Sequence, residues 1–142
     1  MLTHIHIAPT HGAAVHALDT VEAVAGSGLR GDRNFGRERQ VTMVCRGELD
    51  LAASALGLAG IAPGSTRRNL TVDLPTLPRT PGTRLTIGEV VLEVRRDCAP
   101  CETMERSVAA GARLALVDRA GISARVISSG TLTVGDQVSV SG

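Results

Sequence analysis

The sequence predicts a mainly β domain of the α+β class, in which the strands form a barrel and one or two short helices are added. Two observations favour this class. Short alternating or apolar segments recur between glycine- and proline-containing turns, and only one stretch has a clear helical period. The chain of 142 residues also has the length of one domain, which we place at residues 1–142.

The first strand is predicted at residues 2–8, where apolar and polar residues alternate. Ile5 and Ile7 lie on one face of this strand, and His4 and His6 lie on the other. The His-x-His spacing could ligate a metal ion, but the apolar face already explains the pattern. We therefore expect both histidines to be solvated.

Six further strands are predicted from apolar segments bounded by turn residues, at residues 21–25, 40–45, 69–74, 84–87, 90–95 and 124–127. Gly88-Glu89 is expected to form a tight turn between two of them. Near the end of the chain, Gly135-Asp136 is flanked by segments 131–134 and 137–140. This pattern predicts a closing hairpin.

The clearest helix is predicted at residues 47–56, where four apolar residues recur at helical spacing. Glu48 and Asp50 lie in its first turn, where the helix dipole favours acidic side chains, and Gly57 is a suitable end. Residues 108–118 are a weaker helix candidate because a glycine interrupts them.

Composition excludes several classes of protein. Charged residues make up 20% of the chain and the net charge is +1, so no nucleic-acid-coating surface is expected. Phe35 is the only Phe, Trp or Tyr residue, which leaves no stacking platform for single-stranded nucleic acid. No apolar run approaches the roughly 18 residues of a membrane span. Without a signal segment, and with an odd number of cysteines, we expect a cytoplasmic protein with reduced thiols and no membrane partner.

A Cys-x-x-Cys turn, Cys98 to Cys101, follows the strand predicted at residues 90–95. A thiolate is both a nucleophile and a soft metal ligand, and the arginines just before the turn favour the thiolate form. Four interpretations stay open: half of a zinc site, a redox dithiol, a ligand for another soft metal, and two inert buried cysteines. Zinc is disfavoured because Cys45 is the only other thiol and all histidines precede residue 17. The redox dithiol is disfavoured because the surroundings are rich in strands.

Two more polar clusters lie in predicted loops, where side chains can converge on a ligand. One is the glycine-rich loop 26–34, which contains Asp32 and Arg33 and needs positive φ at a glycine. The other is Arg67-Arg68-Asn69, whose arginines could hold a phosphate through charge-assisted hydrogen bonds. The alternatives are an ion pair between Asp32 and Arg33, and two solvated arginines.

Together and in this order, these motifs resemble the MOSC domain, named for the C-terminal domain of molybdenum cofactor sulfurases. Each motif is short, and their joint occurrence over nearly the whole chain is what makes the resemblance specific. The matching segments are Ile5-His6-Ile7-Ala8-Pro9, Gly28-Leu29-x-Gly31-Asp32-Arg33, Arg39-Gln40-Val41-Thr42, Arg67-Arg68-Asn69-Leu70-Thr71-Val72, Ile87-Gly88-x-Val90, Cys98-x-Pro100-Cys101 and Gly130-Thr131-Leu132-x-Val134-Gly135-Asp136.

The resemblance implies a β-barrel that binds the molybdenum cofactor (molybdopterin), a pterin with a dithiolene and a phosphate. It also implies that a cysteine thiolate ligates the molybdenum. Cys101, which follows Pro100, matches that cysteine best, and Cys98 is the second candidate. The implied cofactor-binding residues are Arg67 and Asn69, which match a family Arg-x-Asn, together with Arg68, Arg33 and Asp32.

By the same resemblance, the thiolate acts as a molybdenum ligand or sulfur acceptor in oxidoreductase or sulfur-transfer chemistry. The implied partners are the pterin cofactor and an electron-transfer or sulfur-donor protein. The alternative function is a non-catalytic carrier of cofactor or sulfur that works with a separate enzyme, and a structural β domain with inert cysteines is the third. Covalently bound pyridoxal phosphate is excluded because the chain contains no lysine.

Overall fold

The computed structural model describes residues 1–141. Its strands are β1 (Leu2–Ile7), β2 (His16–Leu18), β3 (Thr20–Val24), β4 (Gly28–Leu29), β5 (Val41–Cys45), β6 (Leu70–Val72), β7 (Arg84–Ile87), β8 (Val90–Asp97), β9 (Ile122–Ser128), β10 (Gly130–Thr133) and β11 (Val138–Ser141). Its helices are α1 (Arg46–Ala55), the 3₁₀ helix η1 (Pro63–Thr66), α2 (Glu102–Ser107) and α3 (Ala112–Ala115). The mainly β class with a few short helices is thus confirmed.

The strands form two sheets instead of the closed barrel that the sequence predicts. The larger sheet has the order β11-β7-β8-β9-β5-β6-β1-β2, and the smaller one has the order β10-β3-β4. Within residues 1–141, strands β11 and β2 are opposite edges of the larger sheet, so hydrogen bonds do not close it. The barrel prediction is corrected to two sheets that share one core.

The predicted terminal hairpin is also wrong. Strand β10 pairs with β3, whereas β11 pairs with β7. The turn between them is a corner instead, because Gly135 N donates to Leu2 O and Leu2 N donates to Asp136 O, each at 2.8 Å. Contacts with the first strand therefore separate two neighbouring strands that the sequence pattern pairs.

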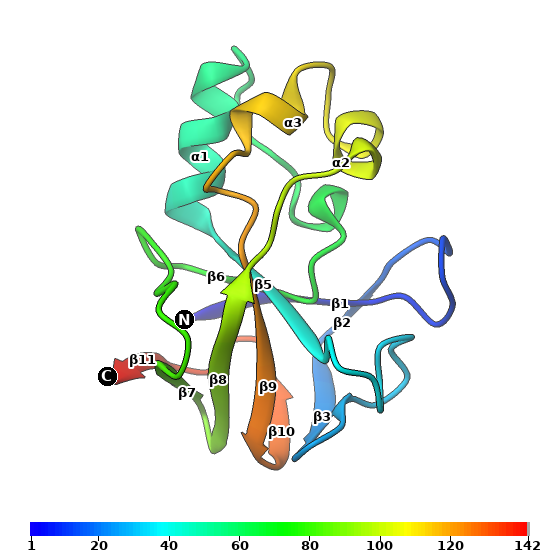
Figure 1. Ribbon diagram of the computed structural model, residues 1–142, viewed down its shortest axis with the longest axis vertical. Coiled ribbons are helices and arrows are strands. Elements are labelled where there is room, and N and C mark those ends of the chain that lie inside the picture. The colour runs from blue at the N-terminus through cyan, green and yellow to red at the C-terminus, as the bar shows by residue number, and fades with distance from the viewer. Residues whose placement is uncertain (142) are drawn as a thin grey trace.

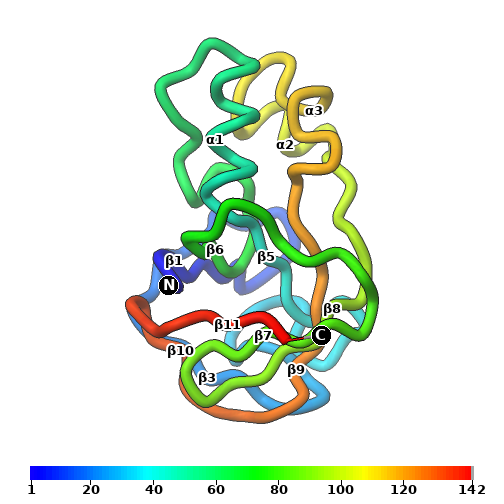
Figure 2. Tube along the Cα trace, turned by 90° about the vertical axis from the view of Figure 1, so that its left-hand side faces the viewer, coloured from blue at the N-terminus to red at the C-terminus, as the bar shows by residue number. Residues whose placement is uncertain are grey.

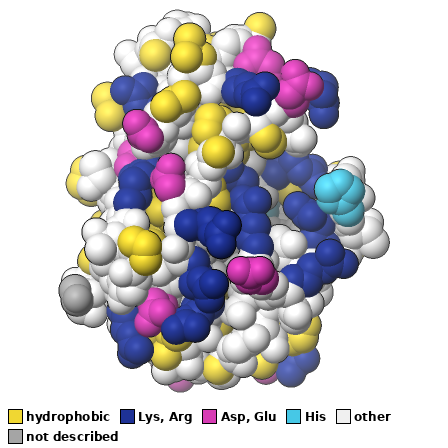
Figure 3. Space-filling model, viewed as in Figure 1, with side chains coloured by type: hydrophobic (Ala, Val, Ile, Leu, Met, Phe, Trp, Pro, Cys, Tyr) yellow, Lys and Arg dark blue, Asp and Glu magenta, His cyan; other side chains and the backbone are white. Residues whose placement is uncertain are grey.

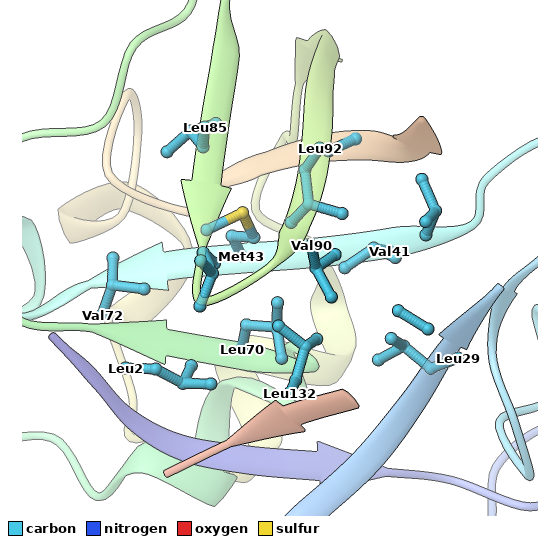
Figure 4. Close-up of a cluster of buried hydrophobic side chains, with 14 of the residues drawn as sticks. Leu2, Leu29, Val41, Met43, Leu70, Val72, Leu85, Val90, Leu92 and Leu132 are labelled. Carbon is cyan, nitrogen blue, oxygen red and sulfur yellow. The ribbon is translucent and has the colours of Figure 1, made fainter. Parts of the chain in front are cut away.

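The main core lies between the two sheets. Leu29 and Leu132 come from the smaller sheet, and they point into the same interior as Met43, Leu70 and Leu85 of the larger one (Figure 4). All five side chains are fully buried. Packing of side chains, rather than a continuous ladder, thus joins the two sheets.

A second core holds the helices at one end of the molecule (Figures 1 and 2). Val44 of β5 packs in this core with Leu49 of α1, Met104 of α2 and Leu116 at the end of α3. Strand β5 is buried on both faces because alternate side chains enter the two cores.

The helix predicted at residues 47–56 is confirmed as α1, but the candidate at residues 108–118 is reduced to the single turn α3. Gly111, at the start of α3, has φ +88°, which stops a longer helix from forming. The carboxylate of Glu105 accepts hydrogen bonds from Gly111 N at 2.6 Å and Arg113 N at 2.8 Å. Helix α2 has no apolar period that the sequence could have revealed.

The expectation that both β1 histidines are solvated is wrong for His6. His4 is exposed, but His6 is 7% exposed and lies beneath η1, next to Gly64. Its Nδ1 atom has no hydrogen-bond partner among residues 1–141. Burial, with a smaller contribution from the charge of His4, lowers the pKa of His6 below its ordinary value of 6.5.

We predict that Gly31→Ala destabilises the fold by more than about 1 kcal/mol. Gly31 has φ +86°, as the glycine-rich loop requires, and a Cβ there would lie 3.2 Å from Ile7 Cδ1. The control is Gly60→Ala, because a Cβ at Gly60 has open space and no positive φ to oppose it. Denaturant unfolding of both variants is the measurement, and a Gly31→Ala protein as stable as wild type would reject the strained turn.

The buried His6 predicts that stability falls as pH decreases below about 6.5. The unfolded chain takes up a proton on this imidazole near pH 6.5, whereas the folded chain does so at lower pH. The loss approaches about 1.4 kcal/mol per pH unit until the folded pKa is reached. Unfolding free energies from pH 7.5 to 5 should show a shallower slope for His6→Gln and the wild-type slope for the exposed control His16→Gln.

Candidate functional site

Six of the seven predicted site residues line one cavity of about 480 Å³, here called the first cavity. They are Cys101, Arg67, Arg68, Asn69, Arg33 and Asp32. The seventh, Cys98, lines a second cavity of about 350 Å³ with Glu38, Arg39, Arg95, Arg96 and Ser123. Arg39 lines both cavities, so they are neighbours that share this residue.

Basic charge is concentrated around these cavities. Seven of the fifteen arginines line them, against three carboxylates, although the whole chain has a net charge of only +1. Figure 3 shows basic side chains gathered across the middle of one face, between the helical end and the strands. Such a surface attracts anions.

The two thiols of the Cys-x-x-Cys turn differ in exposure. Cys98 is 4% exposed and accepts a hydrogen bond from Arg39 Nη2 at 3.3 Å, whereas Cys101 is exposed at the start of α2. Partial burial alone would raise the pKa of Cys101, but hydrogen bonds from Met104 N–H and from Thr103, with the charge of Arg68, lower it below its ordinary value. Cys101 is therefore the more accessible thiol of the pair, and its surroundings favour the thiolate form.

Cys45, the third thiol, lies outside both cavities. It is fully buried in the main core, and this burial raises its pKa to about 12. The sequence had left burial open for both thiols of the Cys-x-x-Cys pair; of these two only Cys98 is buried, and Cys45 is buried as well.

Arg68 is the most buried arginine of the site, with 8% of its surface exposed. Its Nε donates to Ala120 O at 2.9 Å and its Nη2 to Ala99 O at 3.4 Å, so it ties the Cys-x-x-Cys turn to the residues before β9. Within residues 1–141 it forms no ion pair with a carboxylate. The solvated arginine that the sequence left open does not describe it.

Arg67 occupies a strained backbone position. Its φ of +61° at the end of η1 is rare for a residue with a side chain, and its Nη2 donates to Ala13 O at 2.6 Å. The guanidinium lines the first cavity while it holds the loop between β1 and β2.

Asn69 lines the same cavity, but its amide is largely used inside the protein. Its Oδ1 accepts from Thr42 N at 3.0 Å and from Thr42 Oγ1 at 3.2 Å, and its Nδ2 donates to His6 O at 3.1 Å. The side chain thereby joins β5, β6 and β1 beneath the site.

The glycine-rich loop contributes Asp32 and Arg33, which do not pair with each other within the described residues. The buried carboxylate of Asp32 accepts from Ala8 N at 3.0 Å and from Asn34 N at 3.3 Å. Arg33 is exposed, and its Nη1 lies 3.1 Å from His11 Nδ1. The ion-pair alternative is thus wrong. Asp32 stabilises the loop through hydrogen bonds from the backbone, and the charge of Arg33 is exposed to solvent.

Sequence reasoning assigned no role to four further residues that line the first cavity: Arg39, Arg106, Thr103 and His11. Arg39 follows the glycine-rich loop, but the thiol to which it donates, that of Cys98, lies 59 residues further along the chain. Thr103 and Arg106 belong to α2, which lacked a sequence signal. The one available signal was that Arg39 stands inside a motif of the MOSC resemblance.

Metal-ligating side chains and apolar helices are two further features of residues 1–141 that bear on function. No three or more His, Cys, Asp or Glu side chains are grouped there to hold a metal ion, so the zinc alternative finds no ligand set in this part of the chain. None of the helices described is both long and apolar enough to cross a membrane.

The structure defines a class of protein by its two sheets, its helical end and its Cys-x-x-Cys turn beside an arginine-lined cavity. Comparison with known protein families identifies this class. The MOSC domain family model matches residues 30–139, and the chain belongs to this family. No curated protein matches the chain.

Solved structures show the same fold. The YuaD protein from Bacillus subtilis is similar with a TM-score of 0.84 and 20% identity, over 99% of this chain and 96% of that one. YiiM from Geobacillus stearothermophilus is similar with a TM-score of 0.70 and 12% identity, over 100% of this chain and 76% of that one. YiiM from Escherichia coli has a TM-score of 0.66 and 18% identity, over 100% and 70% of the two chains.

We predict that Cys101 is alkylated fastest by iodoacetamide in the native protein, with a pH midpoint below that of an ordinary thiol. Thr103→Ala removes a donor to its sulfur and should raise that midpoint. Peptide mapping of alkylation rates from pH 6 to 10 is the measurement. Ser54→Ala on the exposed side of α1 is the control, and buried Cys45 should stay unmodified.

Proposed function

We propose that this chain binds the molybdenum cofactor in the first cavity, with Cys101 as molybdenum ligand or sulfur acceptor, and takes part in oxidoreductase or sulfur-transfer chemistry. Membership of the MOSC family supports the choice of cofactor. The structural observation that carries the proposal is the buried guanidinium of Arg68, which has no carboxylate partner in residues 1–141 and lines the same cavity as Cys101.

A buried charge is costly unless an opposite charge or several hydrogen bonds compensate it. Two backbone carbonyls accept from Arg68, but they supply no negative charge. Burial lowers the pKa of Arg68, and the neighbouring thiols of Cys98 and Cys101 act in the opposite direction. A thiolate at Cys101 and an anionic ligand in the cavity would therefore both stabilise this arrangement.

The donor set fits such a cofactor. The low-pKa thiol of Cys101 suits a soft metal, and exposed Arg33 and Arg106, with half-buried Arg67, suit the phosphate end. Asn69 and Asp32 are bonded within the protein, so in this proposal they fix the wall. When bound, the cofactor would supply the two-electron redox chemistry, while the protein supplies binding and orientation.

The cavity volume favours the oxidoreductase over the carrier as the first candidate. About 480 Å³ lies within the usual range for a small-molecule site, whereas a carrier of sulfur alone needs only an accessible thiolate. Exposure of Cys101 keeps the sulfur or cofactor carrier as the second candidate. An electron-transfer or sulfur-donor protein as partner and a cytoplasmic location belong to the same proposal, and three free thiols suit a reducing compartment.

Metal analysis tests the proposal. Wild-type protein produced in a host that makes the cofactor should contain molybdenum, Cys101→Ser should lose it, and Cys98→Ser should lose less. The reason is that Cys101 shares the first cavity with the arginines whereas Cys98 faces the second. Elemental analysis per mole of folded protein is the measurement.

Thermal melts of each variant show whether the fold survives, and Arg113→Ala, an exposed arginine of α3, controls for changed net charge. Metal content in Cys101→Ser equal to that of wild type would reject Cys101 as the ligand. Loss in Cys98→Ser alone would exchange the roles of the two thiols, and a wild type without molybdenum would reject the cofactor.

A further inference from the structure

The second cavity has no role in the function proposed above. It lies beside the end of β8, where Arg95 and Arg96 reach it, and Ser123 of β9 also lines it. Its volume of about 350 Å³ is at the lower end for small-molecule sites. The buried thiol of Cys98 lies in its wall.

A carboxylate of the protein already lies between two of these guanidinium groups. Glu38 Oε1 is 3.7 Å from Arg95 Nη2 and 3.8 Å from Arg96 Nη2. Both distances exceed those of charge-assisted hydrogen bonds, which are about 2.7–2.9 Å. The side chain of Glu38 is 79% exposed, so solvent screens these contacts and they hold it weakly.

The other charges leave the cavity basic. Asp97 also lines it, but its Oδ1 accepts from Arg79 Nε at 2.8 Å. Arg39 donates to the thiol of Cys98 and forms no ion pair among the described residues. Three guanidinium groups thus face one weakly held carboxylate.

We propose that the second cavity binds a small carboxylate-bearing molecule, whose carboxylate takes the place of the Glu38 side chain between Arg95 and Arg96. Arg95 and Arg96 already lie near one carboxylate, that of Glu38. The planar fork of a guanidinium group also matches the planar shape of a carboxylate. Arg39 lies where it can contact the same ligand, because it lines this cavity as well as the first one.

A role for the bound carboxylate follows from the proposed function. If the cofactor occupies the first cavity, the second cavity is the adjoining subsite for the substrate, and Arg39 lies between the two ligands. The substrate class is then a small carboxylate, held by its charged end next to Cys98.

The test is a titration of isotopically labelled, cofactor-free protein with malonate at constant ionic strength, followed by amide NMR shifts. Arg96, Cys98 and Ser123 should shift together with one dissociation constant. Arg95→Ala/Arg96→Ala should weaken this constant at least tenfold because both forks are lost. Glu38→Gln should tighten it about two- to fivefold because a competing carboxylate is removed.

Matched variants control for net charge. Arg30→Ala/Arg113→Ala and Glu22→Gln change the charge equally outside both cavities and should leave the constant unchanged. Malonate shifts confined to the first cavity, or equal weakening by the control arginine pair, would overturn the proposal. Inorganic phosphate that binds more tightly than malonate at matched charge would overturn the carboxylate assignment.

These outcomes are independent of the proposed function. The titration uses protein without cofactor and reports on the second cavity, whereas the molybdenum measurement reports on Cys101 in the first. A protein that retains molybdenum but ignores malonate would reject only the subsite. One that binds malonate at Arg96 without ever holding molybdenum would keep the carboxylate site and reject the cofactor.

Discussion

The burial of β5 on both faces is the constraint on which the site depends. Its side chains alternate, so Met43 enters the core between the sheets while Thr42 and Val44 point to the helical side. Val44 anchors the helical core, and Thr42 holds the amide of Asn69, which in turn bonds to the β1 backbone. One strand therefore fixes the sheets, the helices and the floor of the first cavity relative to one another.

On this floor, the protein places positive charge without matching negative charge. Arg68 is held by the carbonyl group of Ala99 inside the Cys-x-x-Cys turn and by that of Ala120 before β9, and Arg67 has a strained backbone at the neighbouring position. Both arrangements cost free energy, since a buried unpaired charge and a left-handed non-glycine residue are each unfavourable. Such costs are typical of functional sites, where a ligand or a thiolate recovers part of them.

The sequence revealed local features better than long-range ones. The strand predicted at residues 84–87 matches β7 because its alternating pattern and its adjacent turn are local. The same logic failed at Gly135-Asp136, since backbone bonds to Leu2, more than 130 residues away, turn the expected hairpin into a corner. The sequence pattern predicted a solvated His6, but the side chain is buried. The residues of η1, which cover it, are distant in sequence, so the local pattern could not show this. Site motifs were identified individually, but their division between two cavities required the three-dimensional arrangement.

That division gives the two cysteines different surroundings although only two residues separate them. Cys98 is buried and accepts a hydrogen bond from Arg39. Cys101 directly precedes α2, and its thiol accepts hydrogen bonds from backbone N–H groups and a hydroxyl group. A symmetric dithiol would need both sulfurs to be comparably accessible, but one is buried and the other exposed. The two thiols therefore differ in accessibility and lie beside different cavities, with Cys101 in the wall of the first and Cys98 in the wall of the second, and Arg39 lines both.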